Sequence, residues 1–347
     1  MKEAKKRNNI IDLYRFIAAV MIMFCHTDLL FEKTYASYMF VDFFFILSGY
    51  FTVAHFAKMR ASASPEERGK TAFSYTAHKF LPFLPYLLLA VPITYFARNI
   101  NLLTSGGLGA FIGGFRDMFS EIILLPVTFF SYPIRQLGPL WYLSALLVAM
   151  PFFCYVCQSK YRRFFGIIGL VFAYFFYVSI PVISAFDPVS CVLKAFAAMF
   201  IGMFIYDVVQ EFAKVKLRKW VLTVLTLIEL GGITFAVASA FIDPIYPPHI
   251  QLVIYVIVFI ISLSQQSYTS RIKCSFLSFL GKLSMPIFIW HYAVGRVIMY
   301  HVQPTSSPVK RYLVYFGGTF AISLVSYLVI EFVKKKQIFT KKLLVEK

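Results

Sequence analysis

The sequence predicts an all-α integral membrane protein, a polytopic bundle of about ten transmembrane helices with both termini in the cytoplasm. Three observations support this class. Of the 347 residues, 59% are hydrophobic and only 14% are charged, and the mean hydropathy is +0.73. Long apolar runs recur along the whole chain, and basic residues gather in alternate connections between these runs. Soluble domains carry about 25% charged residues, so the composition excludes an ordinary soluble fold.

The apolar runs define the individual spans. About 20 apolar residues in a helix cross a hydrocarbon core of about 30 Å. Ten such runs lie near residues 10–30, 38–58, 79–97, 138–158, 164–183, 189–208, 218–241, 248–266, 280–301 and 311–333. An even number of spans places both termini on the same side of the membrane.

Basic residues indicate which side this is, because cytoplasmic loops of membrane proteins are enriched in lysine and arginine. With ten spans, 25 of the 34 basic residues fall in the two tails and the even-numbered connections, and six fall on the opposite side. Both termini are therefore predicted to be cytoplasmic. The formal net charge of +18 follows from this distribution, and we expect no nucleic-acid binding.

A single membrane domain over 1–347 is the simplest organisation, because no internal repeat is visible and no connection has room for a soluble domain. Its predicted parts outside the spans are a cytoplasmic N-terminal tail (1–9), an outer loop (98–137) and a cytoplasmic C-terminal tail (334–347). Within the outer loop, residues 119–130 are expected to lie along the interface or to re-enter the membrane. The cytoplasmic connection 60–79 is expected to be a polar linker.

The first span carries the most informative polar side chains. Ten residues separate Arg15 from His26, so the two share one helical face and lie about 16 Å apart along the axis. An ionisable group at the centre of a span costs about 2.5–3.5 kcal/mol on insertion scales, so this face is expected to point to a polar interior. The structural alternatives are an ion pair between Arg15 and Asp12, and a hydrogen bond from His26 to a backbone carbonyl.

Cysteine spacing gives a weaker signal. Cys154 and Cys157 have the spacing of a zinc or redox pair, but no second pair and no nearby histidine accompany them. We therefore interpret them as small apolar side chains on a membrane helix and expect no metal site.

The first fifty residues contain a joint pattern of an arginine, ten further residues, a histidine, and then Asp-Phe-Phe and Ser-Gly-Tyr. The pattern consists of IDLYRFIAA (11–19), His26 and VDFFFILSGY (41–50). Looser similarities follow in WYL (141–143), FIGM (200–203) and LGKLSMP (280–286), which leads to Trp290 and His291. Together these segments resemble the membrane acyltransferase-3 family. Gly49, beside Ser48, is expected to mark close helix packing.

The resemblance implies transfer of an acyl group, expected to be acetyl, from cytoplasmic acyl-CoA to a hydroxyl of an envelope polysaccharide or lipid-linked glycan. The implied location is the inner membrane of a bacterium, with acyl-CoA as co-substrate and no bound cofactor. Many members carry an Arg-x-x-Arg pair before the third span, where this chain has Lys79 and Pro82. Many also carry a glutamate shortly after Trp-x-Leu, where this chain has Ala145 and Leu146.

Acyl transfer chemistry assigns roles to these residues. Histidine titrates near pH 7, so His26 is the predicted base that takes the proton of the acceptor hydroxyl. Asp42 is expected at a similar depth and would fix the tautomer of His26 in a catalytic dyad. Arg15 lies near the cytoplasmic end of its span and is predicted to bind the phosphate-rich donor. Lys79, at the family's arginine position, is assigned to the donor as well.

Four further residues are assigned to acceptor binding or structural support: Trp141, Lys194, His291 and Arg296. Lys194 and Arg296 are expected in the outer halves of their spans, where they would face an anionic acceptor. Glu229 would instead neutralise one of them, in a buried ion pair that locks the bundle. His291 would line the same cavity or bond across helices.

Two other functional classes stay open. A transporter or flippase of an anionic lipid-linked saccharide would use the same buried charges as a path, although no paired glycine- or proline-broken spans are visible. A scaffold that recruits envelope enzymes would tolerate neutral substitutions at Arg15 and His26. Turnover of acyl-CoA separates the acyltransferase from both alternatives.

Overall fold

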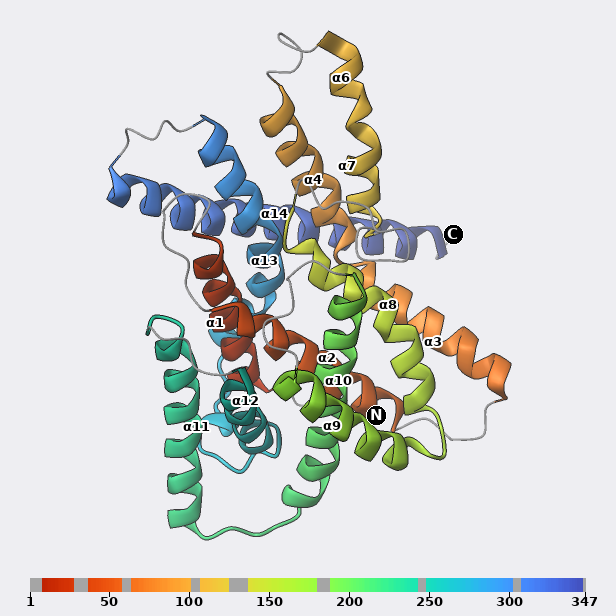
Figure 1. Cartoon of the computed structure of the whole chain (residues 1–347), viewed down its shortest axis with the longest axis vertical. Coiled ribbons are helices and arrows are strands. Elements are labelled where there is room, and N and C mark those ends of the chain that lie inside the picture. The colour runs from red at the N-terminus through yellow and green to blue at the C-terminus, as the bar shows by residue number, and fades with distance from the viewer. Residues whose placement is uncertain are drawn as a thin grey trace.

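A computed structural model of the chain shows a bundle of α-helices (Figure 1). The structure describes residues 8–27, 37–57, 64–100, 107–124, 137–179, 188–242, 248–301 and 307–345. No β-strand occurs within these ranges, so the predicted all-α class is confirmed.

Each of the ten predicted spans contains most or all of one helix, although the third, 79–97, begins in the preceding helix. These helices are α1 (Asn9–Cys25), α2 (Phe40–Phe56), α4 (Leu84–Asn99), α8 (Leu140–Cys157), α9 (Arg162–Ser179), α10 (Pro188–Phe212), α11 (Lys219–Ser239), α12 (Pro248–Leu263), α13 (Ser275–His301) and α14 (Pro308–Val345). Two short 3-10 helices, η2 (Ser37–Met39) and η3 (Thr269–Arg271), precede α2 and α13.

Five helices in the described residues are long and apolar enough to cross a membrane: η2 with α2, α8, α10, α11 and the part of α14 from Val309 to Lys336. A sixth span results if α4 and the preceding helix α3 (Pro65–Phe80), which are bent by 53°, count as one. A multi-pass membrane protein is therefore supported. The count of ten spans and the cytoplasmic side of the termini stay predictions.

The connection 60–79 is not the polar linker that we predicted, because its described part forms α3. A capping box begins this helix: the Ser64 hydroxyl accepts from the Glu67 amide at 3.3 Å, and the Glu67 carboxylate accepts from the Ser64 amide at 2.9 Å. Pro65 occupies the first helical position, which suits its fixed backbone angle. The helix packs against α8, where Gln158 donates to the Arg68 carbonyl at 3.1 Å.

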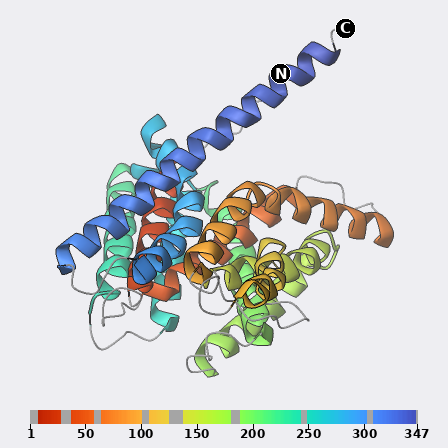
Figure 2. The ribbon, with the colours of Figure 1, turned by 90° about the horizontal axis from the view of Figure 1, so that it is seen from above.

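The predicted outer loop contains two short helices in its described part, α6 (Gly107–Gly113) and α7 (Phe115–Ile122), and α7 packs against α4 (Figure 1). The Glu121 carboxylate is fully buried and accepts from the Leu137 amide at 2.9 Å, which ties α7 to the start of α8. Residues 125–136 lie outside the described residues, so the interfacial or re-entrant segment stays a prediction. The predicted C-terminal tail is a continuation of α14 as far as Val345, and α14 extends well past the bundle (Figure 2).

Two helix pairs place the functional residues. The first is α1 along α13, and the second is α2 along α10. Gly281 at the start of α13 faces the Asp12 side chain, and His291 further along α13 lies beside His26 at the end of α1, so these two helices run parallel. Residues near the start of α1 therefore lie beside residues near the start of α13, and residues at the end of α1 lie beside residues further along α13.

The α2–α10 pair approaches closely through two glycines. A methyl group added at Gly49 would overlap the backbone of Met199, and one added at Gly202 would overlap the backbone carbonyl of Ile46. Small residues allow membrane helices to come this close. The predicted packing role of Gly49 is confirmed.

We predict that Gly202→Ala destabilises the bundle, because the new methyl group meets backbone rather than a movable side chain. Overpacking typically costs about 1–3 kcal/mol, so the thermal midpoint of the detergent-solubilised protein should fall by a few degrees. Gly231→Ala in α11 is the matched control, since nothing lies within 4 Å of its added methyl group. Equal midpoints for the two variants would show that the α2–α10 contact does not limit stability.

Candidate active site

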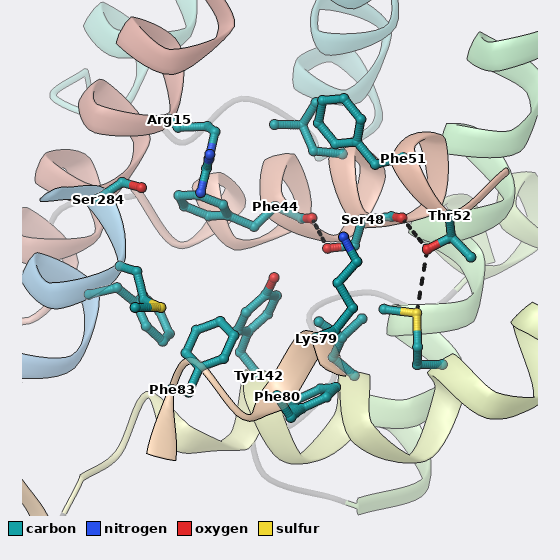
Figure 3. A pocket seen from close by; sticks show the side chains of 15 residues that line it. Arg15, Phe44, Ser48, Phe51, Thr52, Lys79, Phe80, Phe83, Tyr142 and Ser284 are labelled. Atoms are coloured by element: carbon teal, nitrogen blue, oxygen red, sulfur yellow. Dashed lines mark hydrogen bonds between the residues drawn. The ribbon is translucent and has the colours of Figure 1, made fainter. Parts of the chain in front are cut away.

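A pocket of about 310 Å³ lies between α1, α2, α3, α8 and α13 (Figure 3). Two cationic side chains line it, Arg15 from α1 and Lys79 from α3, and Figure 3 shows both pointing into the space. Hydroxyl groups come from Ser48, Tyr142 and Ser284, among others, and the rest of the wall is aliphatic and aromatic. The structure thus brings the two predicted donor-binding residues together in one place.

Arg15 also forms an ion pair with Asp12, which the sequence left open as a structural role for this arginine. Its Nη1 atom lies 3.7 Å from Asp12 Oδ1, and the Arg15 side chain is 35% exposed. A guanidinium has five N–H donors, so the ion pair and the binding of a second anion are compatible. The ion pair orients Arg15 while its side chain lines the pocket.

Three aromatic rings close one end of the pocket. The ring centroids of Phe44 and Tyr142 are 6.4 Å apart, those of Phe44 and Phe288 are 6.5 Å apart, and those of Tyr142 and Phe288 are 5.5 Å apart. We call these three residues the aromatic cluster. Lining residues continue along α2 to Thr52 and along α8 to Met150, so in the predicted topology the cluster is the outer end of the pocket.

Two histidines lie beyond the aromatic cluster. His291, one turn after Phe288 in α13, is fully buried, and its ring centroid is 6.0 Å from that of Phe288. His26 caps the end of α1, and its ring centroid lies 5.3 Å from that of His291. The Tyr292 ring is also 5.3 Å from His26. The structure therefore joins two residues that the sequence assigned to different roles.

Hydrogen bonding fixes the tautomer of His291. Its Nδ1 atom lies 3.1 Å from the carbonyl oxygen of Ile287. A carbonyl oxygen can only accept, so Nδ1 carries the proton of the neutral ring and Nε2 has a free lone pair. Within the described residues, this buried Nε2 atom has no hydrogen-bond partner.

Asp42 belongs to a different cluster. Its carboxylate is fully buried, with Oδ1 accepting from the Tyr177 hydroxyl at 2.6 Å and Oδ2 lying 3.1 Å from Lys194 Nζ. The Lys194 ammonium lies over the rings of Trp141 and Tyr38, at 5.9 and 5.8 Å from their centroids. Of the residues assigned to acceptor binding, Lys194 thus pairs with the predicted catalytic carboxylate, and Trp141 lies against Lys194.

The structure shows an ion pair between Asp42 and Lys194. The catalytic dyad of Asp42 with His26 stays a prediction. Sequence reasoning did not single out Tyr177. This residue lies in a run of aromatic residues in the fifth predicted span, and only a tertiary contact distinguishes it from its neighbours.

The expectation that Glu229 neutralises Lys194 or Arg296 is wrong. The Glu229 carboxylate accepts from the hydroxyls of Tyr14, Ser262 and Thr269, at 2.8, 2.7 and 2.5 Å. Three hydroxyl donors from α1, α12 and η3 converge on this buried acid and satisfy it. Arg296 donates to the Tyr292 hydroxyl at 2.7 Å and lies over the same ring.

Cys154 and Cys157 are both buried in α8, in the manner of small apolar side chains. In the part of the chain that the structure describes, no cluster of three or more histidine, cysteine, aspartate or glutamate side chains has the arrangement of a metal site.

The fold and the site define a multi-pass membrane protein in which a cation-lined pocket ends at an aromatic cluster beside two histidines, the half-buried His26 and the fully buried His291. The family model described as an acyltransferase domain matches residues 8–330. The chain therefore belongs to the acyltransferase-3 family, and it is an acyltransferase. No curated protein and no solved structure matches it.

Proposed function

We propose that this acyltransferase moves an acetyl group from cytoplasmic acetyl-CoA to a hydroxyl of a cell-envelope saccharide, in the inner membrane of a bacterium. The observation that supports this most strongly is the pocket shared by Arg15 and Lys79, which ends at the aromatic cluster next to His291 and His26.

The chemistry of the pocket suits an acyl-CoA donor. The guanidinium of Arg15 and the ammonium of Lys79 attract the phosphates of coenzyme A through charge-assisted hydrogen bonds. The apolar part of the wall accommodates the flexible arm that ends in the thioester. In this arrangement the thioester reaches the aromatic cluster, and the acceptor hydroxyl approaches from the other side.

His26 is the base of the transfer step. As the acceptor oxygen attacks the thioester carbonyl, His26 takes the hydroxyl proton. A carbon–oxygen ester bond forms, the carbon–sulfur bond breaks, and the coenzyme A thiolate leaves and receives the proton from His26. Protons and electrons balance without a metal ion or a redox cofactor.

The acceptor side is formed by Trp141, Lys194 and Arg296. The Arg296 guanidinium binds the hydroxyl of Tyr292, and the Tyr292 ring contacts His26, so its positive charge lies close to the base. This charge suits an anionic acceptor, such as an acidic saccharide or a glycan linked to a lipid phosphate. Lys194 is already paired with Asp42 and contributes less net charge.

The function is tested by transfer of labelled acetyl from acetyl-CoA into envelope glycan, in membranes that contain equal amounts of each variant. We predict that the wild type labels the glycan and that His26→Ala lowers the rate by about 10²–10⁴-fold, the usual contribution of a general base. His249→Ala, an exposed histidine at the start of α12, should retain the wild-type rate.

The opposite result identifies the other class. If wild-type membranes transfer no acyl group from several acyl-CoA donors, and a lipid-linked glycan accumulates inside cells that lack the gene, the protein is a transporter.

The donor site generates a second prediction. Lys79→Gln should raise the KM for acetyl-CoA by about 10-fold or more, because a hydrogen bond to a charged group is typically worth about 1.5–3 kcal/mol. Lys70→Gln on the same helix is the matched control, since Lys70 is exposed and pairs with Glu66 at 2.7 Å. An equal KM for acetyl-CoA in both variants would show that Lys79 does not bind the donor.

The aromatic cluster generates a third prediction, about the length of the acyl group. Because three rings close the pocket, a short acyl group fits and a longer one is excluded. Phe288→Ala should raise the rate ratio of butyryl-CoA to acetyl-CoA by about 10-fold, since a few methylenes in an apolar site are worth about 1–3 kcal/mol. Phe152→Ala, a 61% exposed residue outside the pocket, should leave this ratio unchanged. An unchanged ratio in Phe288→Ala would place the acyl group elsewhere.

A further inference from the structure

We infer that His291 is the positioning residue of His26, so that the catalytic unit is a pair of histidines rather than a histidine with a carboxylate. This inference rests on the proposed function, in which His26 is the base.

The first support is the state of the His291 ring. The side chain is fully buried, and its Nδ1–H is directed at the Ile287 carbonyl oxygen, 3.1 Å away. This bond leaves Nε2 as a hydrogen-bond acceptor. A buried acceptor without a partner costs about 1–3 kcal/mol, and Nε2 has none in the described residues. An acceptor of this kind is expected where a donor arrives during function.

The second support is the position of His26. Its ring centroid is 5.3 Å from that of His291, with 33° between the ring planes. An N–H···N hydrogen bond of about 3 Å between two imidazole rings gives centroids about 5 Å apart. The separation of the rings therefore allows His26 to donate one N–H to His291 Nε2 once its ring is turned toward that atom. The edge-on contact with Tyr292 limits the other orientations of the His26 ring.

The pairing prepares His26 for its role as base. A neutral imidazole has one donor and one acceptor nitrogen. With its N–H directed at His291, His26 presents the other nitrogen, unprotonated, to the acceptor hydroxyl. When His26 takes the hydroxyl proton and becomes cationic, the hydrogen bond to His291 strengthens, because charge-assisted bonds are the stronger ones. His291 keeps its own proton on Nδ1 throughout.

Asp42 is less suited to this role. Its two carboxylate oxygens are engaged by Tyr177 and Lys194, and a buried ion pair that loses one partner leaves an uncompensated charge. In this inference Asp42 holds Lys194 on the acceptor side.

The test compares His291→Gln, His291→Asn and Asp42→Asn in the acetyl-transfer assay. The Gln side chain places an amide oxygen near the former Nε2 position, whereas Asn reaches only as far as Nδ1. We expect His291→Asn to lower kcat by about 100-fold with an unchanged KM for acetyl-CoA, and His291→Gln to recover most of this loss. A role in folding alone would not separate the two variants in kcat while their thermal midpoints agree.

Two results overturn the inference: equal kcat losses in the two His291 variants, or a large kcat loss in Asp42→Asn while His291→Asn keeps the wild-type rate. If His291→Asn does not fold, NMR spectroscopy of the wild-type protein labelled with ¹⁵N-histidine provides the test. A scalar coupling between the ring nitrogens of His26 and His291 would report an N–H···N hydrogen bond. Absence of this coupling, with both rings resolved, also overturns it. Failure of the wild type to transfer acetyl contradicts the proposed function instead.

Discussion

The structure depends on one constraint: a polar group inside an apolar bundle must find its partner within the protein. Three buried carboxylates obey it and join distant parts of the chain. Asp42 connects α2 to α9 and α10, Glu229 connects α11 to α1, α12 and η3, and Glu121 connects α7 to the start of α8. The polar interior thus specifies which helices are neighbours, while apolar contacts supply most of the buried area.

The parallel packing of α1 against α13 converts this interior into an ordered series of chemical environments. Arg15 and Ser284 line the pocket, Phe288 closes it, and His26 and His291 follow at the far end. The order along one helix repeats the order along the other. In the proposed function, a donor that enters between them would meet the cations first, then an apolar wall, then the aromatic cluster, with His26 beyond it. In this proposal, the separation of donor recognition from the chemical step follows from the parallel direction of α1 and α13.

Much of this arrangement could be predicted from the sequence, because helix formation and hydropathy are local properties. Each of the ten predicted spans contains most or all of a helix, and Arg15 and Lys79, both assigned to donor binding, line one pocket. The partners of buried acids were harder to predict. Opposite charge suggested a cation for Glu229, but its partners are hydroxyls, which are too common in the sequence to stand out. Which residues meet across helices depends on rotation and packing, which a single sequence does not record. The helix α3 could have been predicted instead of a polar linker, because the Ser64 and Glu67 of its capping box are visible in the sequence.

The bend between α3 and α4 has a consequence for how the donor is held. Arg15 belongs to a helix in the middle of the bundle, whereas Lys79 lies at the end of α3, just before the chain turns by 53° into α4. The two cations therefore rest on different supports, one on the contact of α1 with α13 and the other on the contact of α3 with α8. A change in this bend would move Lys79, whereas Arg15, His26 and His291 lie on the α1–α13 pair. In the proposed function, donor affinity would thus depend in part on the α3–α4 bend, whereas the chemical step would depend on the α1–α13 pair.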